Sequence, residues 1–100
     1  MGEPWVLALD LGTGGPKTGA VSLQGELLAA ALHHVPTRFT ADGGAIQDPE
    51  QWWSGIRAGV AGILAAGVRP ADLVSVGITG QWGSTVPVAA DGSLAGDCLL

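Results

Sequence analysis

The chain has 100 residues, of which 47% are hydrophobic and 13% are charged, and its formal net charge at pH 7 is −5. This composition is typical of a globular chain and excludes intrinsic disorder, because disordered segments are poor in hydrophobic residues and rich in charge. The length allows one domain with a modest core. Its 17 glycines follow no three-residue period, which excludes collagen and indicates many tight turns.

The basic residues are few and scattered along the chain: Lys17, Arg38, Arg57 and Arg69. They form no positive stripe that would neutralise a phosphate backbone, so nucleic acid is not an expected partner. Cys98 is the only cysteine, which excludes a disulfide framework and agrees with a reducing cytoplasmic compartment. The first apolar run, residues 5–9, is too short for a signal peptide or a membrane span, so no membrane association is expected.

The first third of the chain predicts three strands. Residues 5–9 are almost continuously apolar, as in a buried strand, and the glycine- and proline-rich residues 12–16 predict a tight turn without a regular element. Residues 17–23 and 26–34 predict two further strands, joined by a two-residue turn at 24–25. Residues 26–34 also have helical propensity, but so short a helix is marginal by itself and a two-residue turn favours antiparallel strands.

A loop and a helix are predicted next. Residues 36–47 are polar and aperiodic, which indicates a surface loop. A helix over residues 48–66 is predicted from Asp48 as N-cap, a proline at the first helical position, and Gln51 in place to close a capping box. Apolar residues recur behind this start at helical spacing, and Gly67 with a following proline predicts the end.

Two more strands complete the prediction. Residues 73–78 form an apolar run that ends in Thr79 and Gly80, and a helix between two strands implies a parallel crossover. Residues 84–90 predict a last strand with a proline at an edge or bulge. The expected architecture is therefore α/β with a mixed sheet. Several of the remaining acids, including Asp42 and Asp91, are expected to be solvated turn residues.

The segment from Asp10 to Lys17 has the composition of a phosphate-binding turn. Glycines such as Gly12 and Gly14 let the backbone approach a phosphate, and successive amides can form an anion-binding nest. Thr13 adds a hydroxyl donor, and Asp10 can hold Mg²⁺ through water. Lys17, the only lysine, can place a compact positive charge against the phosphates.

Two better-known phosphate motifs do not match this segment. A Walker loop requires a Gly-Lys pair followed by Ser or Thr, whereas Pro16 precedes Lys17 here. A Rossmann fingerprint requires a glycine at the position of Lys17 and a helix after it, whereas a strand is predicted. A plain hairpin with a solvated lysine remains an alternative.

Three stretches resemble one known family. The segment from Asp10 to Lys17 resembles the first phosphate motif of actin-like ATPases and sugar kinases. Residues 47–53 (QDPEQWW) and 76–84 (VGITGQWGS) are similar to stretches of the FGGY family of carbohydrate kinases, the latter to the sugar-contacting strand and loop of xylulokinase-like members. Gln81 can hydrogen-bond to sugar hydroxyls and Trp82 can offer an apolar face to a sugar. Core packing for Trp82 and a turn role for Gln81 are the simpler alternatives.

The resemblance implies a fold, an activity and a set of ligands. The fold is the ribonuclease H-like or actin-like ATPase fold, with residues 1–100 as an incomplete N-terminal β-β-β-α-β portion. The activity is ATP- and Mg²⁺-dependent phosphorylation of a small-molecule ketose or polyol by a cytoplasmic kinase, with a homodimer as one possible assembly of the complete polypeptide. The catalytic base, an aspartate, is expected beyond residue 100, so residues 1–100 alone are expected to be inactive.

Two departures from the family pattern leave the acceptor open. Trp82 and Gly83 stand where xylulokinases usually have Met and His, and Pro16 replaces a small polar residue of the phosphate turn. A non-enzymatic ATP-binding module of the actin and chaperone type is an alternative from a different class. A degraded remnant that ends at Leu100 is another.

Overall fold

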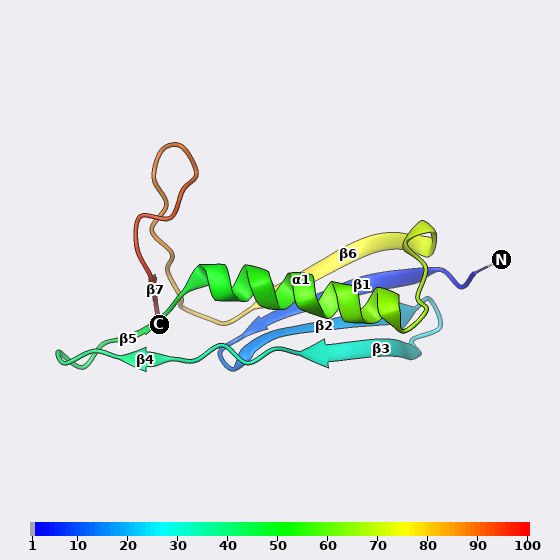
Figure 1. The fold of residues 1–100 in the computed structure, drawn as a ribbon, viewed down its shortest axis with the longest axis horizontal. Helices are drawn as coiled ribbons and strands as arrows, with labels where there is room; N and C mark the ends of the chain where they lie inside the picture. Colours follow the sequence, from blue (N-terminus) through cyan, green and yellow to red (C-terminus); the bar gives the residue numbers. More distant parts are fainter. Residues whose placement is uncertain (1) are drawn as a thin grey trace.

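The computed structural model describes residues 2–100 and is built around a four-stranded mixed sheet (Figure 1). The sheet contains β1 (Trp5–Gly12), β2 (Gly15–Ser22), β3 (Leu27–Leu32) and β6 (Leu73–Gly80), in the order β3-β2-β1-β6. β2 is antiparallel to both β1 and β3, whereas β6 is parallel to β1. The predicted mixed sheet is therefore confirmed, including the strand in place of a helix at β3.

The hairpin between β1 and β2 is tighter than the sequence predicted. Thr13 and Gly14 alone form the turn, whereas Gly15 and Pro16 already belong to β2, so the irregular segment over 12–16 was wrong in extent. Gly15 has φ +127°, and a Cβ atom there would overlap the carbonyl oxygen of His33. Glycine is therefore needed here for close backbone approach within extended structure.

The helix begins and ends close to the predicted bounds. Helix α1 spans Pro49–Ala65, and the Asp48 side chain accepts a hydrogen bond from the Glu50 amide at 3.0 Å. The Gln51 side chain does not return to Asp48 in the hydrogen bonds described for residues 2–100, so the predicted capping box does not form. Beyond the helix, Gly67 has φ +100° and donates its amide to Leu64, as expected of a glycine stop.

The core lies between α1 and the sheet. Its buried members are Trp5, Leu7, Ala20 and Ile63. The indole of Trp5 also donates to the carbonyl oxygen of Arg69 at 2.7 Å, which satisfies its polar atom.

Two glycines on α1 let the helix lie close to β2. A Cβ atom at Gly55 would come within 2.7 Å of Pro16 Cγ, and one at Gly59 would overlap the Thr18 side chain. α1 packs mainly against β2 and β3. The same face of β6 is therefore left uncovered (Figure 1).

A second, small sheet was not predicted. It contains β4 (Arg38–Phe39), β5 (Ala45–Gln47) and β7 (Cys98–Leu99), in the order β4-β5-β7. The expected loop over 36–47 was therefore wrong at its ends, because strands of two or three residues are too short to show a hydrophobic period. The strand predicted over 84–90 was also wrong. Those residues form only isolated bridges from Thr85 and Val88, around a proline that cannot donate to a ladder.

Two exposed aspartates stabilise turns, as expected. Asp42 accepts hydrogen bonds from the Thr40 hydroxyl and the Gly44 amide, and Asp91 accepts from the side chain and amide of Ser93 at 2.6 and 2.9 Å. These donors favour the ionised carboxylate, and in each case the hydroxyl contributes most to lowering the pKa below its ordinary value.

Candidate functional site

The predicted phosphate-binding turn and the predicted sugar-contacting loop meet at one end of the strands of the main sheet. One follows β1 and the other follows β6, and these strands are parallel neighbours, so both loops leave the sheet at the carboxyl ends (Figure 1). The backbone N–H of Gln81 donates to the Leu11 carbonyl oxygen at 2.9 Å, which fixes the second loop against the end of β1. Open α/β sheets bind their ligands at this edge.

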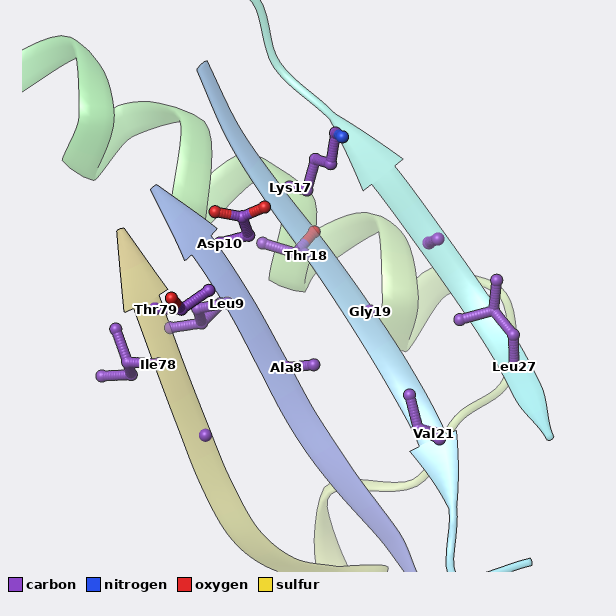
Figure 2. A pocket seen from close by; sticks show the side chains of 12 residues that line it. Ala8, Leu9, Asp10, Lys17, Thr18, Gly19, Val21, Leu27, Ile78 and Thr79 are labelled. Carbon is purple, nitrogen blue, oxygen red and sulfur yellow. The ribbon is translucent and has the colours of Figure 1, made fainter. Parts of the chain in front are cut away.

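Asp10 and Lys17 lie side by side on the sheet face opposite α1. They are direct partners in the β1–β2 pairing, and Asp10 is also paired with Thr79 of β6. Thr18 faces α1, so its neighbour Lys17 points to the other side of the sheet. Figure 2 shows both side chains at the same end of a hollow of about 450 Å³ over this face.

The tip of the β1–β2 hairpin is open to an incoming group. Thr13 and Gly14 are exposed, and a Cβ atom at Gly14 would meet nothing within 4 Å. A Cβ atom at Gly12 would lie 3.9 Å from Asp10 Oδ1, so the backbone of Gly12 passes close to this carboxylate. An accessible glycine backbone beside one carboxylate and one lysine fits a phosphate group with its cation.

A direct metal cage is not present among residues 2–100, which contain no group of three or more His, Cys, Asp or Glu side chains that could hold an ion. Asp10, the predicted Mg²⁺ residue, is not part of such a group.

A hydrogen-bonded chain of side chains joins the two loops. The Thr13 hydroxyl donates to Gln81 Oε1 at 3.0 Å, and Gln81 Nε2 donates to Gln47 Oε1 at 3.2 Å. Gln47 Nε2 donates in turn to the Thr13 carbonyl oxygen at 2.6 Å. The predicted phosphate residue Thr13 and the predicted sugar residue Gln81 are thus in direct contact.

Gln47 is the residue of this site that sequence reasoning missed. Its side chain is fully buried and makes two further hydrogen bonds, from Nε2 to Thr37 Oγ1 at 3.1 Å and to Oε1 from Trp52 Nε1 at 3.1 Å. The signal was a glutamine just before the helix cap, in a stretch similar to the family. The resemblance of that stretch to the family assigned no site role to Gln47.

A small cavity of about 180 Å³ opens beside Gln81. Its lining residues are Leu11, Trp52, Gly80, Gln81, Ser84 and Val86. None of them is charged. Trp82, the other predicted sugar residue, is 99% exposed and does not line this cavity, whereas Trp52 does.

Residues 5–100 match the N-terminal domain of the FGGY family of carbohydrate kinases. The chain belongs to this family. The FGGY resemblance inferred from the three motifs is thereby confirmed.

Relatives of the chain within this family include proteins named glycerol kinase. A glycerol kinase from Xanthobacter autotrophicus is 32% identical over 83 residues, which cover 82% of this chain and 17% of the relative. A glycerol kinase from Rhodospirillum centenum is 33% identical over 88 residues, covering 86% of this chain and 18% of that protein. The chain therefore spans less than a fifth of the length of these relatives.

The fold is shared with solved sugar kinases. The structure of a xyloylose kinase from Brucella ovis superimposes with a TM-score of 0.87 at 26% identity, covering 96% of this chain and 20% of that one. The predicted actin-like ATPase fold of an FGGY N-terminal portion is confirmed. No helix within residues 2–100 is long and apolar enough to cross a membrane.

Proposed function

We propose that the complete polypeptide carrying this chain transfers the γ-phosphoryl group of MgATP to a hydroxyl group of a ketose or polyol. Residues 1–100 are then an incomplete N-terminal domain that supplies half of the cleft. The observation that carries the proposal is the 3.0 Å hydrogen bond between Thr13 and Gln81, because it joins a phosphate loop to an acceptor loop. Membership in the FGGY family supports the same reaction class.

The residues divide into a phosphate side and an acceptor side. Asp10 organises Mg²⁺ through water, and Gly12, Gly14, Lys17 and the backbone amide of Thr13 handle the phosphates of ATP, since the Thr13 hydroxyl donates to Gln81. MgATP supplies the transferred group, and a positive charge near its phosphates offsets the charge that develops during transfer.

Gln81 hydrogen-bonds to hydroxyl groups of the acceptor, and Trp82 packs against the acceptor from the solvent side. The uncharged lining of the cavity beside Gln81 favours a neutral polyol or ketose over an anionic sugar acid. Neutral acceptors of this kind include both a xylulokinase-like acceptor and glycerol. No residue of this chain is assigned as the catalytic base.

A non-enzymatic ATP-binding module is the rival function. It would share the phosphate loop but would need no polar side chain directed at an acceptor. The side-chain amide of Gln81 lines a cavity and is held in place by Thr13 and Gln47. This arrangement favours the kinase over the ATP-binding module. We keep a cytoplasmic location and a homodimer of the complete polypeptide as further predictions.

The test is ADP release by the complete polypeptide with a panel of neutral ketoses and polyols, comparing wild type with Asp10→Asn. We expect acceptor-dependent ADP release that falls on the order of 100-fold in Asp10→Asn, because the amide cannot hold the hydrated cation with a full negative charge. The matched control is Asp91→Asn, in an exposed turn, which should leave the rate nearly unchanged. ATP binding without acceptor dependence would favour the ATP-binding module instead.

A further inference from the structure

The orientation of the Gln47 side-chain amide is determined by one partner that can only donate and one that can only accept a hydrogen bond. Trp52 Nε1 is a donor only, so the atom of Gln47 that faces it at 3.1 Å must be the oxygen. The Thr13 carbonyl is an acceptor only, so the atom of Gln47 that faces it at 2.6 Å must be the nitrogen. Two one-way partners therefore fix the Gln47 amide without ambiguity.

This fixed polarity passes on to Gln81. Because Gln47 presents its oxygen, Gln81 must present its nitrogen, at 3.2 Å. The oxygen of Gln81 is then left to accept from the Thr13 hydroxyl at 3.0 Å. Each atom of the Gln81 amide has used one hydrogen-bonding position, so one N–H and one lone pair remain for a ligand.

Burial makes this arrangement stiff. The Gln47 side chain is fully buried and has four hydrogen-bond partners, and reversing its amide would leave several polar groups facing the wrong way. Each buried polar atom left without a partner would lose its hydration without gaining a hydrogen bond, which disfavours the reversed amide. Gln81 itself is only partly buried and lines the 180 Å³ cavity.

We propose that Gln47, held by Trp52, is a positioning residue that sets which hydrogen-bonding atoms Gln81 presents to the acceptor. This inference rests on the proposed kinase function and deepens it. Gln47 does not touch the acceptor. It acts by holding the amide of Gln81 in one orientation, so that a hydroxyl group can donate to its oxygen and accept from its nitrogen in a fixed arrangement.

The first variant to measure is Gln47→Leu in the complete polypeptide, with Gln51→Leu as the matched control. Gln51 is exposed on the first turn of α1, four positions further along the chain. In Gln47→Leu we expect kcat/KM for the acceptor to fall on the order of 10- to 100-fold, because a misplaced positioning group costs rates of this size. The KM for ATP should change far less, and Gln51→Leu should match wild type.

A spectroscopic reading separates contact from general damage. The indole N–H resonance of Trp52, assigned with Trp52→Phe, should shift upfield in Gln47→Leu because its acceptor is gone, and should not move in Gln51→Leu. If Gln47→Leu does not fold, Gln47→Met carries the test. It keeps the length of the unbranched side chain and removes both polar atoms, and it should lower acceptor kcat/KM about three- to tenfold with an unchanged KM for ATP.

The outcomes are distinguishable. A wild-type polypeptide without acceptor-dependent ADP release would overturn the proposed function, and the positioning role with it, even where the indole shift shows the contact. An active wild type whose Gln47→Leu variant shows the indole shift but keeps its acceptor kcat/KM would overturn the positioning role alone. Equal losses for ATP and acceptor would also overturn it, because they would indicate general loosening of the domain.

Discussion

Trp82 has a proposed role that can be separated from folding, because its side chain is 99% exposed. Removing it should change stability by no more than about 0.5 kcal/mol, as for other surface substitutions. If it packs against the acceptor, Trp82→Ala should raise the acceptor KM several-fold, with the thermal midpoint preserved. The same assay on Trp82→Phe should recover most of the loss, since a phenyl ring also offers an apolar face.

The control for Trp82 is Phe39→Ala, which removes an equally open aromatic side chain, 81% exposed, from the small sheet. It should alter neither the acceptor KM nor the midpoint. Equal acceptor constants in Trp82→Ala and wild type would exclude Trp82 from the acceptor site. Trp52, which lines the cavity beside Gln81, would then be the aromatic side chain left to contact the acceptor.

The residues of the phosphate and acceptor loops were predictable because each motif is short and continuous in sequence. Asp10, Thr13 and Lys17 lie within eight positions, and Gln81 follows directly from its strand. Gln47 was not predictable in the same way. Its partners Thr13 and Gln81 each lie 34 positions away, in opposite directions along the chain, so only the fold brings them together.

Close contact between α1 and β2 requires glycine at two of the three glycine positions inside the helix. A Cβ atom at Gly59 would overlap Thr18, and one at Gly55 would lie 2.7 Å from Pro16, whereas one at Gly62 would meet nothing within 4 Å. The same substitution should therefore have opposite effects on stability along one helix.

Gly62→Ala should stabilise the domain by about 0.5–1 kcal/mol, because alanine has the higher helix propensity and no neighbour opposes its methyl group. Gly59→Ala should destabilise it by about 1–3 kcal/mol, as overpacking does in a close contact. Shifts of the urea unfolding midpoint of the complete polypeptide, followed by tryptophan fluorescence, compare both variants with wild type. A stabilising Gly59→Ala would mean that α1 does not lie this close to β2.

Pro16 illustrates how element and site are connected. In the sequence it was a departure from the family's phosphate turn, whereas in the structure it is a buried residue of β2 that faces Gly55. Its ring fills space between strand and helix and leaves the turn at Thr13–Gly14 unobstructed. The elements with a long apolar pattern were predictable, and the short strands β4, β5 and β7 depend on contacts between distant segments.

At the scale of the whole molecule, the main sheet is only partly covered. All eight residues of β6 are exposed, and Val76 and Ile78 share a face with the core residues of β1, with which they are paired. α1 lies mainly over β2 and β3, and Val76 and Ile78 remain 48% and 68% exposed. Exposed apolar surface of this extent normally contacts another part of the protein or a partner.

We therefore expect the 100-residue chain alone to bind a hydrophobic dye strongly and to melt over a broad range, since one helix leaves the β6 side of the sheet open. The double variant Val76→Thr and Ile78→Thr should lower dye fluorescence, because it removes apolar surface and keeps β-branched side chains. Val88→Thr is the control, since Val88 is 58% exposed but lies outside both sheets. A sharp two-state melt without dye binding would contradict this expectation and show that β6 is stable with its apolar face in water.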